Sequence, residues 1–192
     1  MVRPQGGQER DRRVDLSEGG PGGGATRPMI DCGDLDLRIE ADGSWHYRGS
    51  RIDRQPLVRL FASVLRREPD GSYWLVTPVE RGRVEVADAP FLAVEAEVTG
   101  EGQARRVRLR TNLDRWVELG PEHGLRSGQG PDGGPRLYAQ LEGGLEAALS
   151  RPVWYQLLEL AIEDSGPDGP VGLWAGGHRH DLSSLAVDGD TA

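Results

Sequence analysis

The stretch RQPLVRLFASVLRREPDGSYWLV, residues 54–76, decides the fold class of this protein. Its apolar residues recur at three- and four-residue spacing, which predicts an amphipathic helix ending near Glu68. Asp53 precedes the helix as a candidate N-cap, and Pro56 falls in the first turn, where a missing N–H does no harm. The tripeptide at residues 69–71, Pro-Asp-Gly, then turns the chain into a strand rich in aromatic residues. A helix, a turn and a strand in direct succession indicate an α+β protein.

A second stretch resembles the first. SRPVWYQLLELAIEDSGPDGPVGLW, residues 150–174, begins with a capping serine and a first-turn proline, and ends in another Pro-Asp-Gly before an apolar strand. Setting Arg54 against Arg151 pairs Val58 with Tyr155, Leu60 with Leu157, and Leu65 with Ile162. We therefore predict a duplicated core of two related halves, each made of antiparallel strands and one amphipathic helix, with the two helices equivalent. The alternative is that any two amphipathic helices align this well, and a third Pro-Asp-Gly at residues 131–133 shows that the tripeptide is common here.

The remaining chain contains strand patterns. LDLRIEADGSWHYRGSRI, residues 35–52, alternates around Asp42-Gly43, a dipeptide typical of tight hairpins, which predicts strands at residues 36–40 and 45–48. Further strands are expected at residues 72–79, 82–87, 90–98, 104–111 and 136–141, and after the second helix. Residues 1–28 contain too few large apolar side chains to form a core, so we expect a disordered tail. The predicted halves are residues 29–103 and 104–192.

Composition excludes several kinds of protein. The formal charge of −8 and the pI near 5.1 argue against bulk affinity for nucleic acid or anionic membranes. All 23 basic residues are arginine, and the absence of lysine excludes a Walker-type phosphate loop, a Schiff-base enzyme and a lysine general base. The chain has no run of ~18 apolar residues and no apolar signal-peptide core. We therefore expect a soluble cytoplasmic protein.

Reactive and metal-ligating residues are few. Cys32 is the only cysteine, which excludes an intramolecular disulfide. A nucleophilic thiolate is the functional alternative, but the neighbouring Asp31 and Asp34 disfavour it, so we expect a structural role. His178 and His180 share one face of a predicted strand, yet two nitrogen ligands do not close a metal site. No motif of a serine hydrolase, zinc protease or dinucleotide-binding fold occurs, so we expect no enzyme activity, no metal and no cofactor.

Arginines form a stripe in the segment ARRVRLR. A hairpin register that pairs Glu97 with Arg106 and Glu95 with Arg108 gives cross-strand ion pairs on a solvated face. Arg110 is left without an acidic partner in this register. A guanidinium binds phosphate or carboxylate in a bidentate manner, so Arg110 is the residue expected to meet an anion.

Four segments resemble a bacterial family known as domain of unknown function 1285. They are DGSWHYRGSRI, LVRLFASVLRRE, DGSYWLVTPVE and VADAPF, in that order, between residues 42 and 91. The resemblance runs from about Ile39 to Leu185. It implies a core of two related halves, the C-terminal one loosely similar to pleckstrin-homology folds, with a ligand site at their boundary for a nucleotide-like molecule and a signalling role. It implies no established activity and no proven site residue.

We expect the binding cleft between the halves, near the strand that ends in RTN. Arg110 and Asn112 are predicted at its polar rim, with Trp74 or Trp154 as an apolar wall. The candidate ligand-binding residues are Arg110, Thr111, Asn112, Trp74, Thr77, Glu80 and Trp154. Alternatively, Arg110 reaches Glu40 or Glu80, and the polar groups in strands are satisfied by structural hydrogen bonds.

The function expected from these observations is a non-enzymatic module that binds a small anionic or nucleotide-like ligand. The alternative is a protein–protein interaction domain that docks a partner on a sheet edge or a helix. An unrecognised hydrolase is a third hypothesis, weakened by the lack of lysine and of any nucleophile motif.

Overall fold

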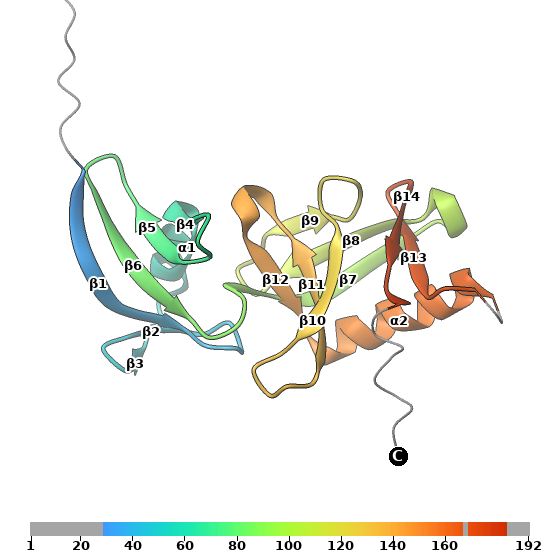
Figure 1. The fold of residues 1–192 in the computed structure, drawn as a ribbon, viewed down its shortest axis with the longest axis horizontal. Helices are drawn as coiled ribbons and strands as arrows, with labels where there is room; N and C mark the ends of the chain where they lie inside the picture. The colour runs from blue at the N-terminus through green and yellow to red at the C-terminus, as the bar shows by residue number, and fades with distance from the viewer. Residues whose placement is uncertain (1–28, 167–168, 184–192) are drawn as a thin grey trace, which may run out of the picture.

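The protein is an α+β structure with two six-stranded sheets, each accompanied by one helix, as predicted, and a separate two-stranded hairpin (Figure 1). The computed structural model describes residues 29–166 and 169–183. The tail expected over residues 1–28 lies outside these residues. The N-terminal half contains β1 (Ile30–Ile39), β2 (Trp45–Tyr47), β3 (Ser50–Arg51), α1 (Gln55–Val64), β4 (Leu65–Arg67), β5 (Tyr73–Val76) and β6 (Glu80–Val86).

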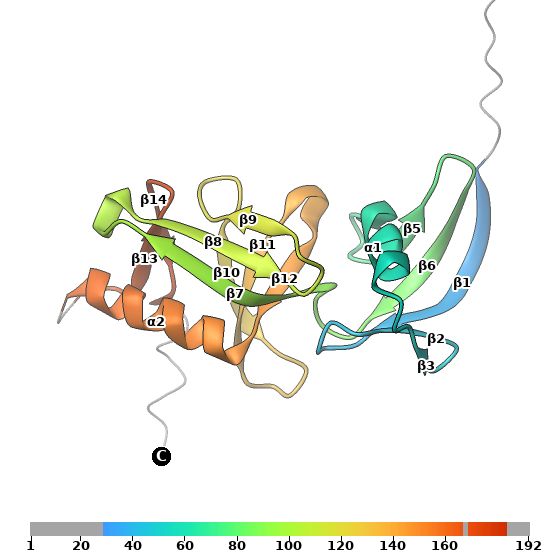
Figure 2. The same ribbon diagram turned by 180° about the vertical axis from the view of Figure 1, so that it is seen from behind.

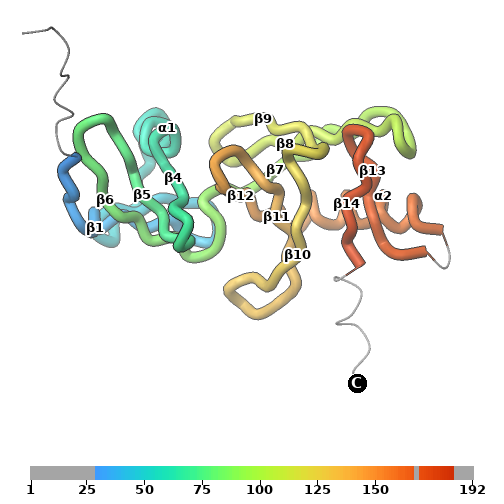
Figure 3. Tube along the Cα trace, turned by 45° about the horizontal axis from the view of Figure 1, so that its top comes forward, coloured from blue at the N-terminus to red at the C-terminus, as the bar shows by residue number. Residues whose placement is uncertain are grey.

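The C-terminal half begins with strand β7 and contains the longer helix. Its elements are β7 (Phe91–Thr99), β8 (Arg106–Thr111), β9 (Trp116–Glu118), β10 (Leu125–Gln129), β11 (Pro135–Gln140), β12 (Glu146–Leu149), α2 (Arg151–Ser165), β13 (Gly172–Ala175) and β14 (His178–Asp181). The last two strands form a separate hairpin. The two halves lie end to end along the long axis of the molecule. The chain passes from the first half to the second once, between β6 and β7 (Figure 3).

The duplication is visible in the order of the strands. The first sheet has the order β3-β2-β1-β6-β5-β4, and the second has the order β9-β8-β7-β12-β11-β10. In each half, three successive strands form one meander and the next three form another. The first strand of the half then pairs in parallel with the sixth, β1 with β6 and β7 with β12. The two halves therefore share one topology, and each sheet is antiparallel except for one pair.

The predicted equivalence of the two helices is wrong. Helix α1 lies between the third and fourth strands of its half, whereas α2 follows the sixth. Burial also disagrees at the aligned positions, because Leu60 is 60% exposed whereas Leu157 is 0% exposed. The pair of Val58 and Tyr155 differs in the opposite direction, because Val58 is buried whereas Tyr155 is exposed. The likeness between the two helical stretches is thus an accident of amphipathicity, and the real repeat lies in the strands.

Helix α1 is shorter than the periodicity predicts. It begins after Arg54 rather than Asp53, and it ends at Val64 instead of near Glu68. Leu65 continues the apolar stripe but is fully buried in β4, where it pairs with Leu75 of β5. The Pro-Asp-Gly turn joins β4 to β5 in a hairpin. Strand β4 therefore contains the residues that the apolar periodicity assigns to the last turn of the helix.

The boundary between the halves lies earlier than the predicted one after residue 103. Strand β7, which the prediction placed in the N-terminal half, pairs with β8 and β12 and so belongs to the second sheet. Most buried apolar side chains nevertheless form one continuous cluster, from Leu37 on β1 to Leu182 after β14, and Ala89, Tyr138 and Ala148 form a small separate one. The pleckstrin-homology likeness of the C-terminal half stays a prediction.

Candidate functional site

An apolar groove opens between α1 and its sheet. Its volume is about 700 Å³, and nine of its fourteen lining residues carry large apolar side chains. We call it the α1 groove. Strand β1 and helix α1 supply most of the walls, namely Leu35, Leu37, Leu57, Leu60, Phe61 and Val64. Helix α1 lies on the side of its sheet that faces the C-terminal half (Figure 2).

The groove is open because the helix covers only part of the sheet. Leu60 lines it and remains 60% exposed, while Phe61 turns inward and stacks on the buried Trp45. Gly82 forms part of the lining, and a Cβ atom at this position would lie 2.4 Å from the Leu35 side chain. Glycine is therefore needed where Leu35 lies against β6.

Exposed apolar residues also lie at the end of the sheet where β1 begins, next to the groove residue Glu80. Ile30 at the start of β1 donates its backbone N–H to the carbonyl of Val79, at 2.9 Å. Met29, Ile30 and Val79 are all exposed. Exposed large apolar side chains grouped near a groove commonly mark a binding site.

The polar end of the groove contains Cys32, Thr77, Glu80 and Arg81. The Cys32 Sγ lies 3.8 Å from Glu80 Oε2. The Thr77 hydroxyl donates to the Glu80 carbonyl at 2.9 Å and so closes the turn between β5 and β6. Two of the predicted site residues, Thr77 and Glu80, therefore reach a groove, although it lies within one half.

Arg110 has acidic partners, and the reason for expecting an anion beside it is removed. The β7–β8 hairpin has a register two residues away from the predicted one, so Arg110 lies opposite Glu95. Its Nε donates to Glu95 Oε2 at 2.6 Å, and its Nη1 donates to Asp114 Oδ1 at 3.0 Å. A shift of two residues preserves the inside and outside faces, which explains why Val107 and Leu109 are still buried as expected.

Asn112 lies between the halves, where it makes structural hydrogen bonds. Its Oδ1 accepts from the backbone N–H of Leu92 at 3.1 Å, and its Nδ2 donates to the Gly43 carbonyl at 3.0 Å. Thr111 is buried, and its hydroxyl accepts from the backbone N–H of Arg115 at 3.2 Å. Asn112 thus connects the β8–β9 turn to β7 and to the N-terminal half, Thr111 holds the turn itself, and neither residue lines the α1 groove.

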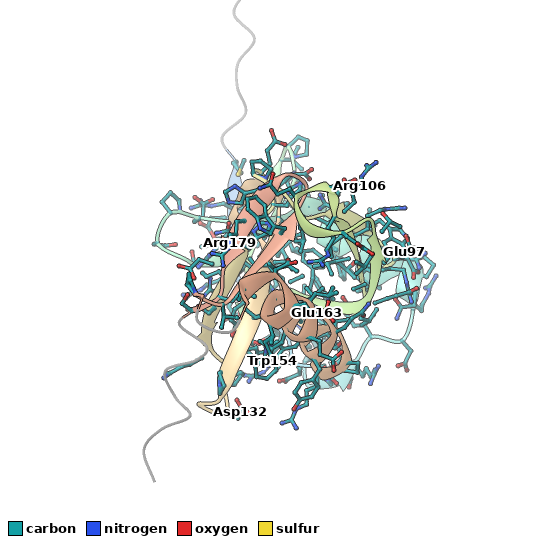
Figure 4. The ribbon with its side chains drawn as sticks, turned by 90° about the vertical axis from the view of Figure 1, so that its right-hand side faces the viewer. Glu97, Arg106, Asp132, Trp154, Glu163 and Arg179 are labelled. Carbon is teal, nitrogen blue, oxygen red and sulfur yellow. The ribbon has the colours of Figure 1, made fainter. Side chains whose placement is uncertain are left out.

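The two candidate tryptophans lie apart. Trp74 on β5 donates its indole N–H to the Ser72 hydroxyl at 2.8 Å and carries the Arg81 guanidinium over its ring. Trp154 lies on α2 in the C-terminal half and stacks on Tyr155 (Figure 4). The structure therefore does not bring Trp74, Trp154 and Arg110 into one cleft.

The histidines of HRHD do share a face of β14, as predicted. The rings of His178 and His180 are 5.0 Å apart, edge to face. His180 is buried, and its Nδ1 accepts from the backbone N–H of Leu125 at 3.3 Å. Burial lowers the pKa of His180 from 6.5 to about 4. In the described part of the chain, no three residues of the types His, Cys, Asp and Glu are grouped to hold a metal ion.

Most of the groove residues are absent from the site predicted from the sequence. Tyr47 lies in a predicted strand and Leu57 in the predicted helix, while Leu35 and Ile52 lie just outside the predicted strands. Nothing in the spacing of these four residues shows that the groove between them stays open. The available signal was Leu57 and Leu60, which broaden the apolar stripe of α1 beyond what one sheet face covers.

Two family models match this chain. The first is the domain of unknown function (DUF1285), N-terminal domain, over residues 27–89, and the second is the protein of unknown function (DUF1285), C-terminal domain, over residues 90–182. The chain belongs to the DUF1285 family. The boundary between the DUF1285 domains falls in the segment that joins β6 to β7.

Two solved structures of the DUF1285 family are similar to the chain. A DUF1285 protein from Silicibacter pomeroyi is 36% identical, with a TM-score of 0.74, and the match covers 88% of this chain and 93% of that one. A DUF1285 protein from Shewanella baltica is 28% identical, with a TM-score of 0.53, and the match covers 68% of this chain and 95% of that one. No curated protein matches the chain. Among the described residues, neither helix combines the length and the apolar character needed to cross a membrane.

Proposed function

We propose that this protein is a non-enzymatic cytoplasmic module that binds a small molecule with an apolar body in the α1 groove. The observation that carries the proposal is the groove itself, about 700 Å³ in volume and lined mainly by large apolar side chains. Binding pockets for small molecules commonly measure ~300–1,000 Å³ and combine an apolar lining with a few polar groups. Transfer of an aliphatic group from water into such a groove is favourable by ~0.8 kcal/mol for each buried CH₂.

A small molecule fits better than an added peptide strand. Only the last three residues of β1, Leu37–Ile39, pair with β2, so the earlier part of β1 has an open edge. This edge is irregular, because the register against β6 shifts twice between Asp31 and Leu37. The carboxylates of Asp31 and Asp34 also accept the backbone N–H groups of Gly33 and Asp36, at 2.9 and 2.8 Å. Bulges and charges of this kind protect a sheet edge against strand addition.

A signalling role is compatible with this proposal through helix α1. The helix borders the groove on one side, and its Arg59 forms an ion pair with Asp114 of the C-terminal half. Asp114 in turn accepts from Arg110, at 3.0 Å. A ligand that shifts α1 therefore also acts on contacts between the halves, as a two-state coupling requires.

Binding of a neutral solvatochromic dye such as Nile red tests the proposal. Leu60→Glu places a charge in the groove at an exposed position, so it is expected to weaken dye binding by ~10-fold or more, about 1.4 kcal/mol. The matched control is Ile162→Glu on α2, since Ile162 is 57% exposed and Leu60 is 60% exposed. The control variant should bind the dye as the wild type does.

The location of the bound molecule is tested with Cys32. This residue is the only cysteine, it is exposed, and it lines the groove. Octanol at a saturating concentration should slow the alkylation of Cys32 by iodoacetamide in the folded protein. If the dye does not bind, or if it binds equally to both glutamate variants while Cys32 stays unprotected, the proposed function is wrong.

A further inference from the structure

We propose that the ligand of the α1 groove carries a cationic ammonium group next to its apolar body, and that this group binds Glu80. The inference rests on the proposed function and names the chemical class of the ligand. It depends on the charges at the polar end of the groove, where Glu80 and Arg81 are the two charged lining residues.

Arg81 is already neutralised. Its Nε and Nη2 donate to Asp31 Oδ2 at 3.1 and 2.9 Å, and its guanidinium lies over the ring of Trp74, 4.6 Å from the centroid. The backbone N–H of Gly33 and the Arg81 guanidinium together lower the pKa of Asp31, so this carboxylate stays charged beside Arg81. An anionic ligand would have to displace Asp31 in order to bind Arg81.

Within the described part of the chain, Glu80 has no such partner. Among residues 29–166 and 169–183, the side-chain contact of its carboxylate is the Cys32 thiol, at 3.8 Å, and no basic side chain forms an ion pair with it. Its side chain is exposed at the mouth of the groove. The polar end thus carries one uncompensated negative charge in a chain whose formal charge is −8, which attracts cations and repels anions.

The two aromatic residues of the groove are less favourable places for the cation, and one of them, Phe61, already stacks on Trp45. Tyr47 lines the groove, but the Arg48 guanidinium already lies over its ring, 5.1 Å from the centroid. Glu80 is therefore the acceptor that remains for a positive group, while the aliphatic or aromatic part of the ligand packs on Leu60, Phe61 and Leu35.

Three eight-carbon probes that differ only in their polar group test the inference. Octylammonium (octylamine protonated at pH 7), octanol and octanoate are compared by displacement of Nile red, all at concentrations below micelle formation. An exposed ion pair contributes little to the free energy of binding, so octylammonium is expected to bind only about threefold more tightly than octanol. Octanoate should bind more weakly than octanol, because Glu80 repels its carboxylate. Glu80→Gln should remove the advantage of octylammonium and leave octanol unchanged.

The control variant is Glu163→Gln. Glu163 is an exposed carboxylate on α2 (Figure 4), a helix that contributes no residue to the lining of the groove, and its substitution removes the same net charge from the chain. If octanoate binds more tightly than octylammonium, or if Glu80→Gln has no more effect than Glu163→Gln, the cationic class is wrong while octanol binding still supports the groove. If none of the three probes displaces the dye and Leu60→Glu has no effect, the groove function itself is wrong.

Discussion

The ion pair between Arg105 and Asp164 is the buried electrostatic contact that we expect to matter most for stability. Arg105 precedes β8 and Asp164 lies in the last turn of α2, and their side chains are 6% and 7% exposed. Arg105 Nη1 donates to Asp164 Oδ2, which also accepts the backbone N–H of Trp174 at 3.0 Å. This pair therefore connects α2 to β8 and β13.

Arg105→Met keeps the apolar length of the side chain and leaves the Asp164 carboxylate buried without its cation. Breaking one side of a buried ion pair costs ~3–5 kcal/mol, because the remaining charge stays desolvated. The free energy of unfolding should therefore fall by ~4 kcal/mol. Urea denaturation followed by circular dichroism and tryptophan fluorescence measures this loss, since Trp174 lies beside the pair.

The double variant Arg105→Met with Asp164→Leu separates the charge effect from packing. Replacement of both charges by apolar groups is often neutral or stabilising, but the Trp174 N–H loses its acceptor, which costs ~1–3 kcal/mol. The double variant should thus be more stable than Arg105→Met alone. Arg108→Met serves as the surface control, because its pair with Glu97 is about half exposed and should contribute less than ~1 kcal/mol. A loss below ~1 kcal/mol for Arg105→Met, or a double variant less stable than the single one, would refute the reasoning.

Three further outcomes follow from the structure. Asn112→Ala removes a hydrogen bond between the halves, the one to the Gly43 carbonyl, and leaves the Leu92 N–H unsatisfied, so it should cost ~2 kcal/mol in urea denaturation; a loss under ~0.5 kcal/mol contradicts the bridging role. Gly43→Ala should destabilise the protein too, since Gly43 has φ +77° and a Cβ there would lie 2.5 Å from Asn112 Nδ2; thermal unfolding with no shift in midpoint speaks against this. His180 stays neutral when folded, with a pKa of about 4, but binds a proton near pH 6.5 when unfolded, so ~3 kcal/mol of stability is lost as the pH falls from 6.5 to 4. His180→Gln should flatten that decline, and an unchanged slope overturns the assignment.

Local patterns predicted the elements of this fold well. The hairpin at Asp42-Gly43, the first-turn proline of each helix and the inward faces of β7 and β8 all depend on neighbours a few residues away. For the same reason, the turn at residues 69–71 was expected correctly, with Gly71 at φ +85°. The sequence by itself also determined the α+β class, whereas the repeat that the structure contains lies in the strand order and not in the helical stretches from which a duplication was predicted.

Pairing over long distances was decided only by the tertiary structure. The parallel contacts of β1 with β6 and of β7 with β12 join residues about 50 positions apart, and no local periodicity records such partners. The register of the β7–β8 hairpin was missed by two residues for a related reason, since a two-residue shift leaves the alternation of faces unchanged. Because of that shift, Arg110 is paired with Glu95 instead of being left without an acidic partner.

The candidate site shows the same division. Thr77 and Glu80 were identified from the sequence as polar residues beside apolar strand runs, and both line the α1 groove. The sequence by itself determined that α1 has a broad apolar face and that no lysine is available for chemistry. Only the tertiary structure decided that this face is incompletely covered, because burial depends on how far a helix lies from its sheet, and that distance is set by contacts between residues remote in sequence.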